Sequence, residues 1–191
     1  MRRLLVILAL LSASTLCLAA PTVSTPIKSV FIWPGVHRCM DNGLHGDVYV
    51  IDAADRQVRL TRDGMCARPK LSPDGNTVGW VHGRHKDLWG DEDRWFLPNE
   101  LVLWRDGKQL QRIKAEGGDY TGWDFAGNGT QVAVAVGSRQ THANAYFLYD
   151  IATLRKVDAC TFWHPSVTGA MSPPDWAKPI WLQMPAALAA P

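Results

Sequence analysis

The stretch LSPDGNTVGWV, residues 71–81, decides the fold class of this chain. Pro73 presets φ for a turn, and Asp74 can hydrogen-bond to its own backbone. Gly75 can take the positive φ that a tight turn between antiparallel strands requires. The residues on both sides of this turn form short β-compatible segments. The sequence therefore predicts a β-hairpin here.

The hairpin belongs to an internal repeat. Residues 47–81 contain DVYVIDAADRQVRLT and ARPKLSPDGNTVGWV, and residues 100–136 contain ELVLWRDGKQLQRIK and TGWDFAGNGTQVAVAV in the same order. A shorter third copy covers residues 145–182. Each copy predicts four short strands separated by turns, and the chain shows almost no helical periodicity. This pattern is typical of β-propeller blades.

The repeat resembles that of the periplasmic TolB-type, WD-repeat-like β-propellers. In that family a strand ending in Asp and a strand ending in Leu-Thr precede Ser-Pro-Asp-Gly and an apolar strand, as in residues 47–81. The resemblance weakens over 100–136 and again over 145–182. It implies an all-β fold of propeller-like blades with four antiparallel strands each. It also implies a protein partner in the envelope of a Gram-negative cell, because TolB-type propellers act as interaction platforms.

The predicted domain covers residues 27–183, followed by a flexible tail at 184–191. Its strands make about three blades, whereas closed propellers typically have four to eight. Three arrangements remain: an open arc or partial propeller, two chains that close one ring, and a twisted sandwich. Unpaired strand edges favour association, so a homo-oligomer is one of the expected outcomes.

Residues 1–20, MRRLLVILALLSASTLCLAA, have the basic start, apolar run and small final residues of a signal peptide. Removing Arg2 and Arg3 lowers the count of Lys and Arg from 20 to 18, equal to the 18 Asp and Glu. This neutral balance argues against nucleic-acid binding. No later apolar segment is long enough to cross a membrane. We therefore expect a periplasmic or secreted protein without stable membrane insertion.

If each repeat is one blade, its tight turns lie on one face and its long connections on the other. All six histidines and the three cysteines after the signal peptide fall in the long connections. Long loops on a rigid scaffold are where binding usually occurs. The sequence therefore predicts a binding surface on this loop face, and its candidate residues are His82, His85, Trp89, Trp95, His142, Trp163 and His164.

The predicted function is a non-catalytic binding or scaffolding module for a protein or small ligand. No nucleophile elbow, metalloprotease motif, phosphate loop or dinucleotide fingerprint is found. The alternative is a metal-assisted hydrolase or lyase with a site built from His82, His85, His142 and His164. A third interpretation, a remnant of a larger propeller without a dedicated ligand, is supported by the weak third repeat.

A divalent metal is the one cofactor that the sequence suggests, with His82, His85 and Asp87 as candidate ligands. The H-x-x-H spacing is common, so a solvated loop without metal is the competing interpretation. Cys39 and Cys66 would emerge on the same face and are predicted to form a disulfide worth about 3 kcal/mol. Cys160 is left as a single thiol, for which a buried or idle role is favoured over a nucleophile.

The tryptophans divide into two predicted groups. Those that follow the alternating strand pattern are expected in the core, and they are Trp33, Trp80, Trp104 and Trp181, with Trp123 assigned to the same group. Those in the long connections are expected to anchor loops or to form an exposed aromatic patch.

Overall fold

The computed structural model describes residues 23–34, 45–87, 94–137, 144–162 and 173–181. These residues form eleven strands, β1 to β11, and three short helical segments, so the fold is all-β as predicted. The strands of the first half are β1 (Ser29–Pro34), β2 (His45–Ile51), β3 (Gln57–Arg59), β4 (Cys66–Leu71), β5 (Thr77–Asp87) and β6 (Arg94–Arg105). The later elements are β7 (Lys108–Lys114), β8 (Asp119–Ala126), η1 (Gly127–Gly129), β9 (Gln131–Gly137), β10 (Asn144–Asp150), β11 (Lys156–Phe162), η2 (Asp175–Ala177) and α1 (Lys178–Trp181).

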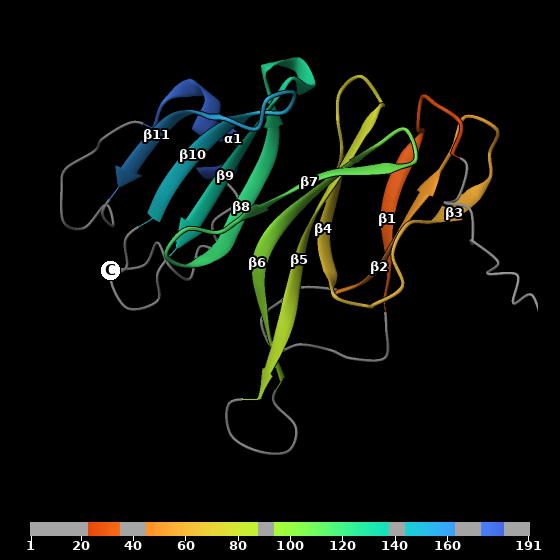
Figure 1. The fold of residues 1–191 in the computed structure, drawn as a ribbon, viewed down its shortest axis with the longest axis horizontal. Helices are drawn as coiled ribbons and strands as arrows, with labels where there is room; N and C mark the ends of the chain where they lie inside the picture. The colour runs from red at the N-terminus through yellow and green to blue at the C-terminus, as the bar shows by residue number, and fades with distance from the viewer. Residues whose placement is uncertain (1–22, 35–44, 88–93, 138–143, 163–172, 182–191) are drawn as a thin grey trace, which may run out of the picture.

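The strands form antiparallel meanders of the propeller-blade type (Figure 1). Strands β4 to β7 pair in chain order to make one four-stranded unit, and β8 to β11 make a second. Strands β1 to β3 make a three-stranded unit that joins β4 through the pairs His45↔Ala67 and Gly46↔Cys66. The prediction of about three blades built on four antiparallel strands is therefore confirmed.

The sheets do not begin where the sequence repeats begin. The copy at 47–81 starts with β2 and ends within β5, but β5 pairs along its whole length with β6 from the next copy. The four-stranded units therefore run over 66–114 and 119–162. A repeat in the sequence does not show which of its strands begins a sheet. Pairing between strands from neighbouring copies decides that.

Both faces of β5 and β6, the central strands of the unit β4–β7, are buried because their side chains alternate between two apolar clusters. One set of alternating residues faces β1–β3 and consists of Val78, Trp80, Val102 and Trp104. The other set faces β8–β11 and includes Val81, Leu101 and Leu103, which pack against Trp123, Val132 and Val134. The two clusters join the three units into stacked layers.

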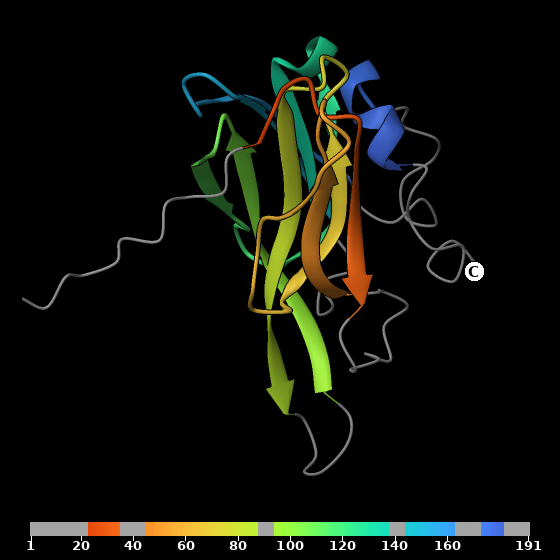
Figure 2. The ribbon, with the colours of Figure 1, turned by 90° about the vertical axis from the view of Figure 1, so that its right-hand side faces the viewer.

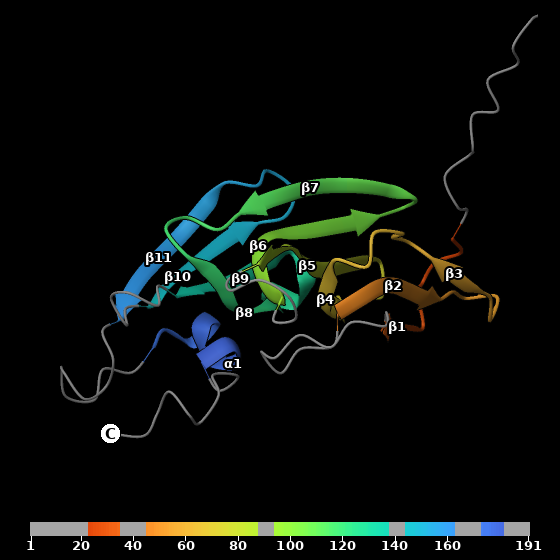
Figure 3. The same cartoon turned by 90° about the horizontal axis from the view of Figure 1, so that it is seen from below.

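The C-terminal helical segments cover the far face of the unit β8–β11 (Figure 3). Ala177 of η2 and Ile180 of α1 pack against Ala133 and Ala135 of β9. Strands were predicted over 145–182, and this is wrong for 175–181. Proline has no N–H to give to a β-ladder, whereas Pro179 fits the first turn of a helix. None of the helices in the described ranges is long and apolar enough to span a membrane.

The predicted tryptophan core is largely correct. Trp80, Trp104 and Trp123 are buried. Trp33 is 62% exposed, so its assignment to the core is wrong. On β1, Val30 and Ile32 pack into the cluster between the layers, and strand alternation turns Trp33 to the opposite face. The core assignment of Trp181 rested on a strand, and this residue ends helix α1 instead.

The strand directions give the molecule two different ends. One end, here called the turn end, carries the tight turns after β2, β4, β6, β8 and β10, at the top of Figure 1. The opposite end, here called the loop end, is the one at which β1, β3, β5, β7, β9 and β11 finish. This separation matches the one expected from the sequence, although several of the predicted connections are shorter because strands extend into them.

Candidate binding site at the loop end

The segment 82–99, predicted as a long connection, is mostly a paired hairpin. Strand β5 continues to Asp87 and β6 begins at Arg94, with pairs that include His85↔Phe96 and Lys86↔Trp95. A register shift follows His82, and beyond it the two strands project past the other strands at the loop end (Figures 1 and 2). We call the projecting segments 83–87 and 94–98 the arm.

The loop prediction failed in this segment because β-forming residues stand on both sides of its centre. The run of Trp95, Phe96 and Leu97 has high strand propensity, and it can pair with residues that precede the connection. Cys66 and His45 likewise begin strands β4 and β2 and are buried, although the sequence placed them in connections.

His82 lies at the base of the arm between two carboxylates. Its Nε2 is 2.9 Å from Oδ2 of Asp63, which comes from the connection between β3 and β4. Its Nδ1 is 3.9 Å from Oε2 of Glu100 on β6, and Arg112 on β7 donates to the same oxygen at 2.6 Å. Residues from four successive parts of the chain thus form one polar row across the sheet.

The row continues through Cys66 toward the first unit. The Cys66 Sγ lies 3.5 Å from Thr61 Oγ1 and 3.6 Å from Asp63 Oδ1. Thr61 Oγ1 is 3.3 Å from Asp47 Oδ1, and Arg59 donates to the other oxygen of Asp47. We call the complete set the loop-end network, and its members are Asp47, Arg59, Thr61, Asp63, Cys66, His82, Glu100 and Arg112.

The two ends of the network are built in the same way. Asp47 pairs with Arg59, and Glu100 pairs with Arg112, with the partners 12 residues apart in each case. The acidic residues stand 53 positions apart (100 − 47), and so do the arginines (112 − 59), which is the spacing of the repeat. The same acid and arginine pair therefore occurs at equivalent positions of two units, and His82 lies beside the second.

The Cys66 thiol is held in its protonated form. Burial raises its pKa to about 12, and the nearby charge of Asp63 acts in the same direction. Cys66 is a free thiol in the structure, and the predicted disulfide stays a prediction. Its proposed partner, Cys39, lies outside the described residues. The Sγ packs inside the sheet against Thr61 and Asp63, which accounts for its low exposure.

Asp63 is the network carboxylate that is most open to solvent. Its side chain is 49% exposed, compared with 16% for Glu100. Burial alone would raise the pKa of Asp63, but hydrogen bonds from the Met65 amide and from His82 lower it below its usual value. Asp63 is therefore ionised at neutral pH and accessible to a ligand.

This arrangement suits binding by hydrogen bonds and ion pairs. Both ring nitrogens of His82 face carboxylates, so neither is directed at a hydroxyl or thiol that it could activate. Burial also raises the pKa of Cys160 to about 11, which suppresses its thiolate form. In the part of the chain that the structure describes, no group of three His, Cys, Asp or Glu side chains could hold a metal ion.

The structure places only some of the residues that the sequence proposed. His82 belongs to the network, while His85, Asp87 and Trp95 have described backbones on the arm but no described side chains. The remaining candidates lie outside the described residues, and they are Trp89, His142, Trp163 and His164. The predicted metal ligation by His82, His85 and Asp87 stays a prediction.

Six members of the network were not predicted from the sequence, and they are Asp47, Arg59, Thr61, Asp63, Glu100 and Arg112. The recurrence of an acid and an arginine 12 residues apart in both copies was the available signal. It becomes convincing only when the strand register brings each pair together.

Comparisons with known proteins find similarity in solved structures alone, since no family model and no curated protein matches the chain. Dipeptidyl peptidase 4 of Porphyromonas gingivalis is 12% identical, with a TM-score of 0.44 over 59% of this chain and 22% of that chain. The β-propeller domain of the Trilobed protease from Pyrococcus furiosus, which has an open velcro topology, is 10% identical. Its TM-score is 0.41, over 66% of this chain and 40% of that chain. A putative dipeptidyl aminopeptidase IV from Bacteroides ovatus is 12% identical, with a TM-score of 0.39 over 65% of this chain and 24% of that chain. This chain spans less than half the length of each.

Proposed function

We propose that this protein is a non-catalytic binding or scaffolding module that engages a protein partner through its loop end. The observation that carries the proposal is the loop-end network, a continuous polar row beside the projecting arm. A row of this kind can give a partner several hydrogen bonds while the paired strands hold its geometry. The protonated Cys66 thiol and the carboxylates on both sides of His82 favour binding over catalysis.

The charges of the network favour a partner with a basic side chain. Three carboxylates face two guanidinium groups, so the formal charge is −1 when His82 is neutral, and the exposed Asp63 carries much of the accessible negative charge. A lysine or arginine of the partner can therefore pair with Asp63 without a large desolvation cost. We place this partner in the cell envelope, because the predicted signal peptide and the resemblance to TolB-type repeats both favour export.

Capture from an envelope extract of the source organism tests this proposal. The mature protein is compared with Asp63→Asn combined with His82→Gln, which removes the central charge and its partner. Asp55→Asn is the matched control, because Asp55 is also an exposed, ion-paired carboxylate, bonded to Lys28 at the turn end.

We expect the unaltered protein and the control to capture the same partner in equal amounts. The loop-end variant should capture about tenfold less of that partner. Thermal melting must first show that all three proteins fold. Equal capture by the three folded proteins would contradict a loop-end site. Capture should also weaken as salt rises, since surface charge pairs are screened.

A further inference from the structure

In the described residues strand β1 pairs on one edge only, whereas β5 and β9 pair on both. Just before β1 the Ile27 amide donates to the Gly75 carbonyl of the β4–β5 turn at 2.7 Å, so the unpaired edge begins at Ser29. Strand β1 pairs with β2 through six residue pairs, from Ser29↔Ile51 to Pro34↔Gly46. In the described part of the chain no strand pairs with its other edge. Strand β1 holds the same place in its unit as β5 and β9 hold in theirs. The corresponding edge of β5 is paired with β4, and that of β9 is paired with β8. Among the described residues the first unit therefore has no fourth strand at this position.

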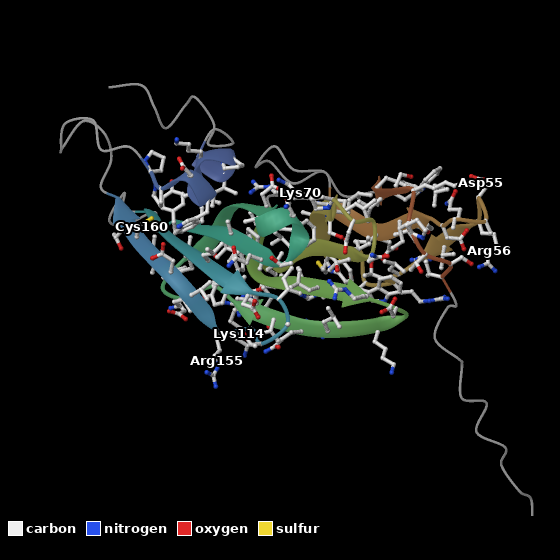
Figure 4. All side chains as sticks on the ribbon, turned by 90° about the horizontal axis from the view of Figure 1, so that it is seen from above. Asp55, Arg56, Lys70, Lys114, Arg155 and Cys160 are labelled. Atoms are coloured by element: carbon white, nitrogen blue, oxygen red, sulfur yellow. The ribbon has the colours of Figure 1, made fainter. Side chains whose placement is uncertain are left out.

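The other sheet edges carry features that discourage strand addition. Strand β7 has three exposed cations, Lys108, Arg112 and Lys114, the last of which is seen at the outer edge in Figure 4. Strand β11 has a register shift against β10 and carries Lys156 and Asp158. Charges and bulges are common ways in which proteins protect strand edges.

The edges of β3 and β8 are also protected. Strand β3 has only three residues. Strand β8 has a register shift and is tied to β4 by the Lys70–Asp124 ion pair at 2.8 Å. Figure 4 shows Lys70 on the opposite side of the molecule from Lys114 and Arg155. Strand β1, with the sequence SVFIWP, has no charge and no register shift, and its single proline is its last residue.

The side chains of β1 offer apolar contacts on both faces of this edge. Val30 and Ile32 pack against the cluster between the first two layers. On the opposite face Phe31 stacks on Tyr49 with ring centroids 5.7 Å apart, and the exposed Trp33 lies 6.5 Å from the same ring. An added strand would place alternate side chains beside each of these apolar groups.

We propose that the free edge of β1 accepts an extended segment of a partner polypeptide as the fourth strand of the first unit. Backbone hydrogen bonds to β1 would supply affinity, and contacts with Phe31 and Trp33 would supply selectivity. A six-residue strand is about 20 Å long. Pairing along it buries much less than the ~800 Å² per partner of a stable complex, which favours a segment over a second copy of this chain. This surface borders the loop-end network, because Trp33 lies opposite Asp47 in the β1–β2 pairing and Arg59 lies over the Tyr49 ring. Strand β1 itself carries no residue of that network, so protection of its amides reports on edge pairing alone.

Hydrogen exchange of the β1 amides, measured by mass spectrometry, tests the proposal. The probe is a synthetic peptide with the sequence of residues 119–128, DYTGWDFAGN, because β8 holds the equivalent position in its own unit. Its control is the same peptide with proline at the position of Trp123, which cannot donate at that point of a ladder. The probe should slow exchange in residues 29–33 at least tenfold at saturation, and the proline peptide should leave it unchanged.

Two protein variants distinguish pairing at the β1 edge from nonspecific hydrophobic binding of the peptide. Trp33→Lys places a charge beside the incoming strand and should raise the Kd of the probe at least tenfold. Val157→Lys changes a similarly exposed apolar residue on β11 and should leave the Kd unchanged. Because the proline peptide is tested on the unaltered protein, the result does not depend on the folding of either variant.

Three results would overturn the proposal. The first is unchanged exchange of the β1 amides with the probe at millimolar concentration. The second is strong protection of all the β1 amides, including those that do not pair with β2, before any peptide is added. That result would mean that the chain fills its own edge. The third is protection that grows with protein concentration alone, which would assign the edge to a second copy.

Discussion

Replacing Gly79 by alanine tests the contact between the two four-stranded units. A Cβ at this position of β5 would lie 2.5 Å from Cη2 of Trp123 and 2.9 Å from Cζ3, on the facing strand β8. It would also lie 3.2 Å from Cδ2 of Leu103. The indole cannot move freely, because its Nε1 donates to the Arg68 carbonyl at 3.0 Å and its ring packs edge-on against Phe125.

We therefore expect Gly79→Ala to destabilise the fold by about 1–3 kcal/mol, the usual cost of overpacking. For a chain of this size that corresponds to a fall in Tm of roughly 2–12 °C. Trp123→Phe removes the far edge of the indole and opens space at the same point. In that background Gly79→Ala should cost at least ~1 kcal/mol less, because contacting residues couple.

Urea unfolding of the four proteins of this double-mutant cycle measures both quantities. Gly122→Ala is the matched control, because Gly122 is also a buried strand glycine, but its added Cβ would meet only ordinary contacts of 3.4 Å or more. This control should be neutral or slightly stabilising, by about 0.5–1 kcal/mol. An equal cost of Gly79→Ala with Trp or Phe at position 123 would refute the face-to-face packing of the two units.

Two further predictions concern titrating groups. Burial alone would raise the pKa of Asp52, but hydrogen bonds from Arg56 and from the amides of Ser24 and Ala54 lower it to about 2. The ionised carboxylate therefore stabilises the fold above its unfolded pKa of about 4, and this contribution is lost as the pH falls toward 2. Asp52→Asn should flatten the pH dependence of unfolding between pH 4 and 2, and an unchanged slope in urea titrations would contradict the assignment. The Cys66 thiol, with its pKa of about 12, should react with iodoacetamide at pH 8 roughly 1000-fold more slowly in the folded than in the unfolded protein. Peptide mapping by mass spectrometry measures both rates, and similar rates would argue against a buried, protonated thiol.

Local turn chemistry made much of the fold predictable from the sequence. Gly75 has a φ of +72°, as its turn requires, and the Asp74 carboxylate accepts hydrogen bonds from Ser72 and from the amide of Asn76 within the same turn. These contacts join residues at most two positions apart, except that Ser72 also accepts from the amide of Thr77. Such local bonds form wherever the same short sequence occurs, which is why the repeat indicated strands and turns correctly.

Features that depend on distant contacts could not be predicted in the same way. The arm exists because β5 pairs with β6, and the exposure of Trp33 follows from which face of β1 meets the next layer. The sequence identified His82, but its partners Asp63 and Glu100 come from other elements, 19 and 18 positions away. Their proximity follows from strand register, which spacing along one chain does not determine.

Site-specific photo-crosslinking shows whether a partner binds at the loop end. A photoreactive amino acid is placed at position 63 in one protein and at position 55, at the turn end, in another, and both are irradiated in intact cells of the source organism. We expect one protein adduct from position 63 and none from position 55. An adduct from position 55 alone, or equal adducts from both positions, would contradict binding at the loop end.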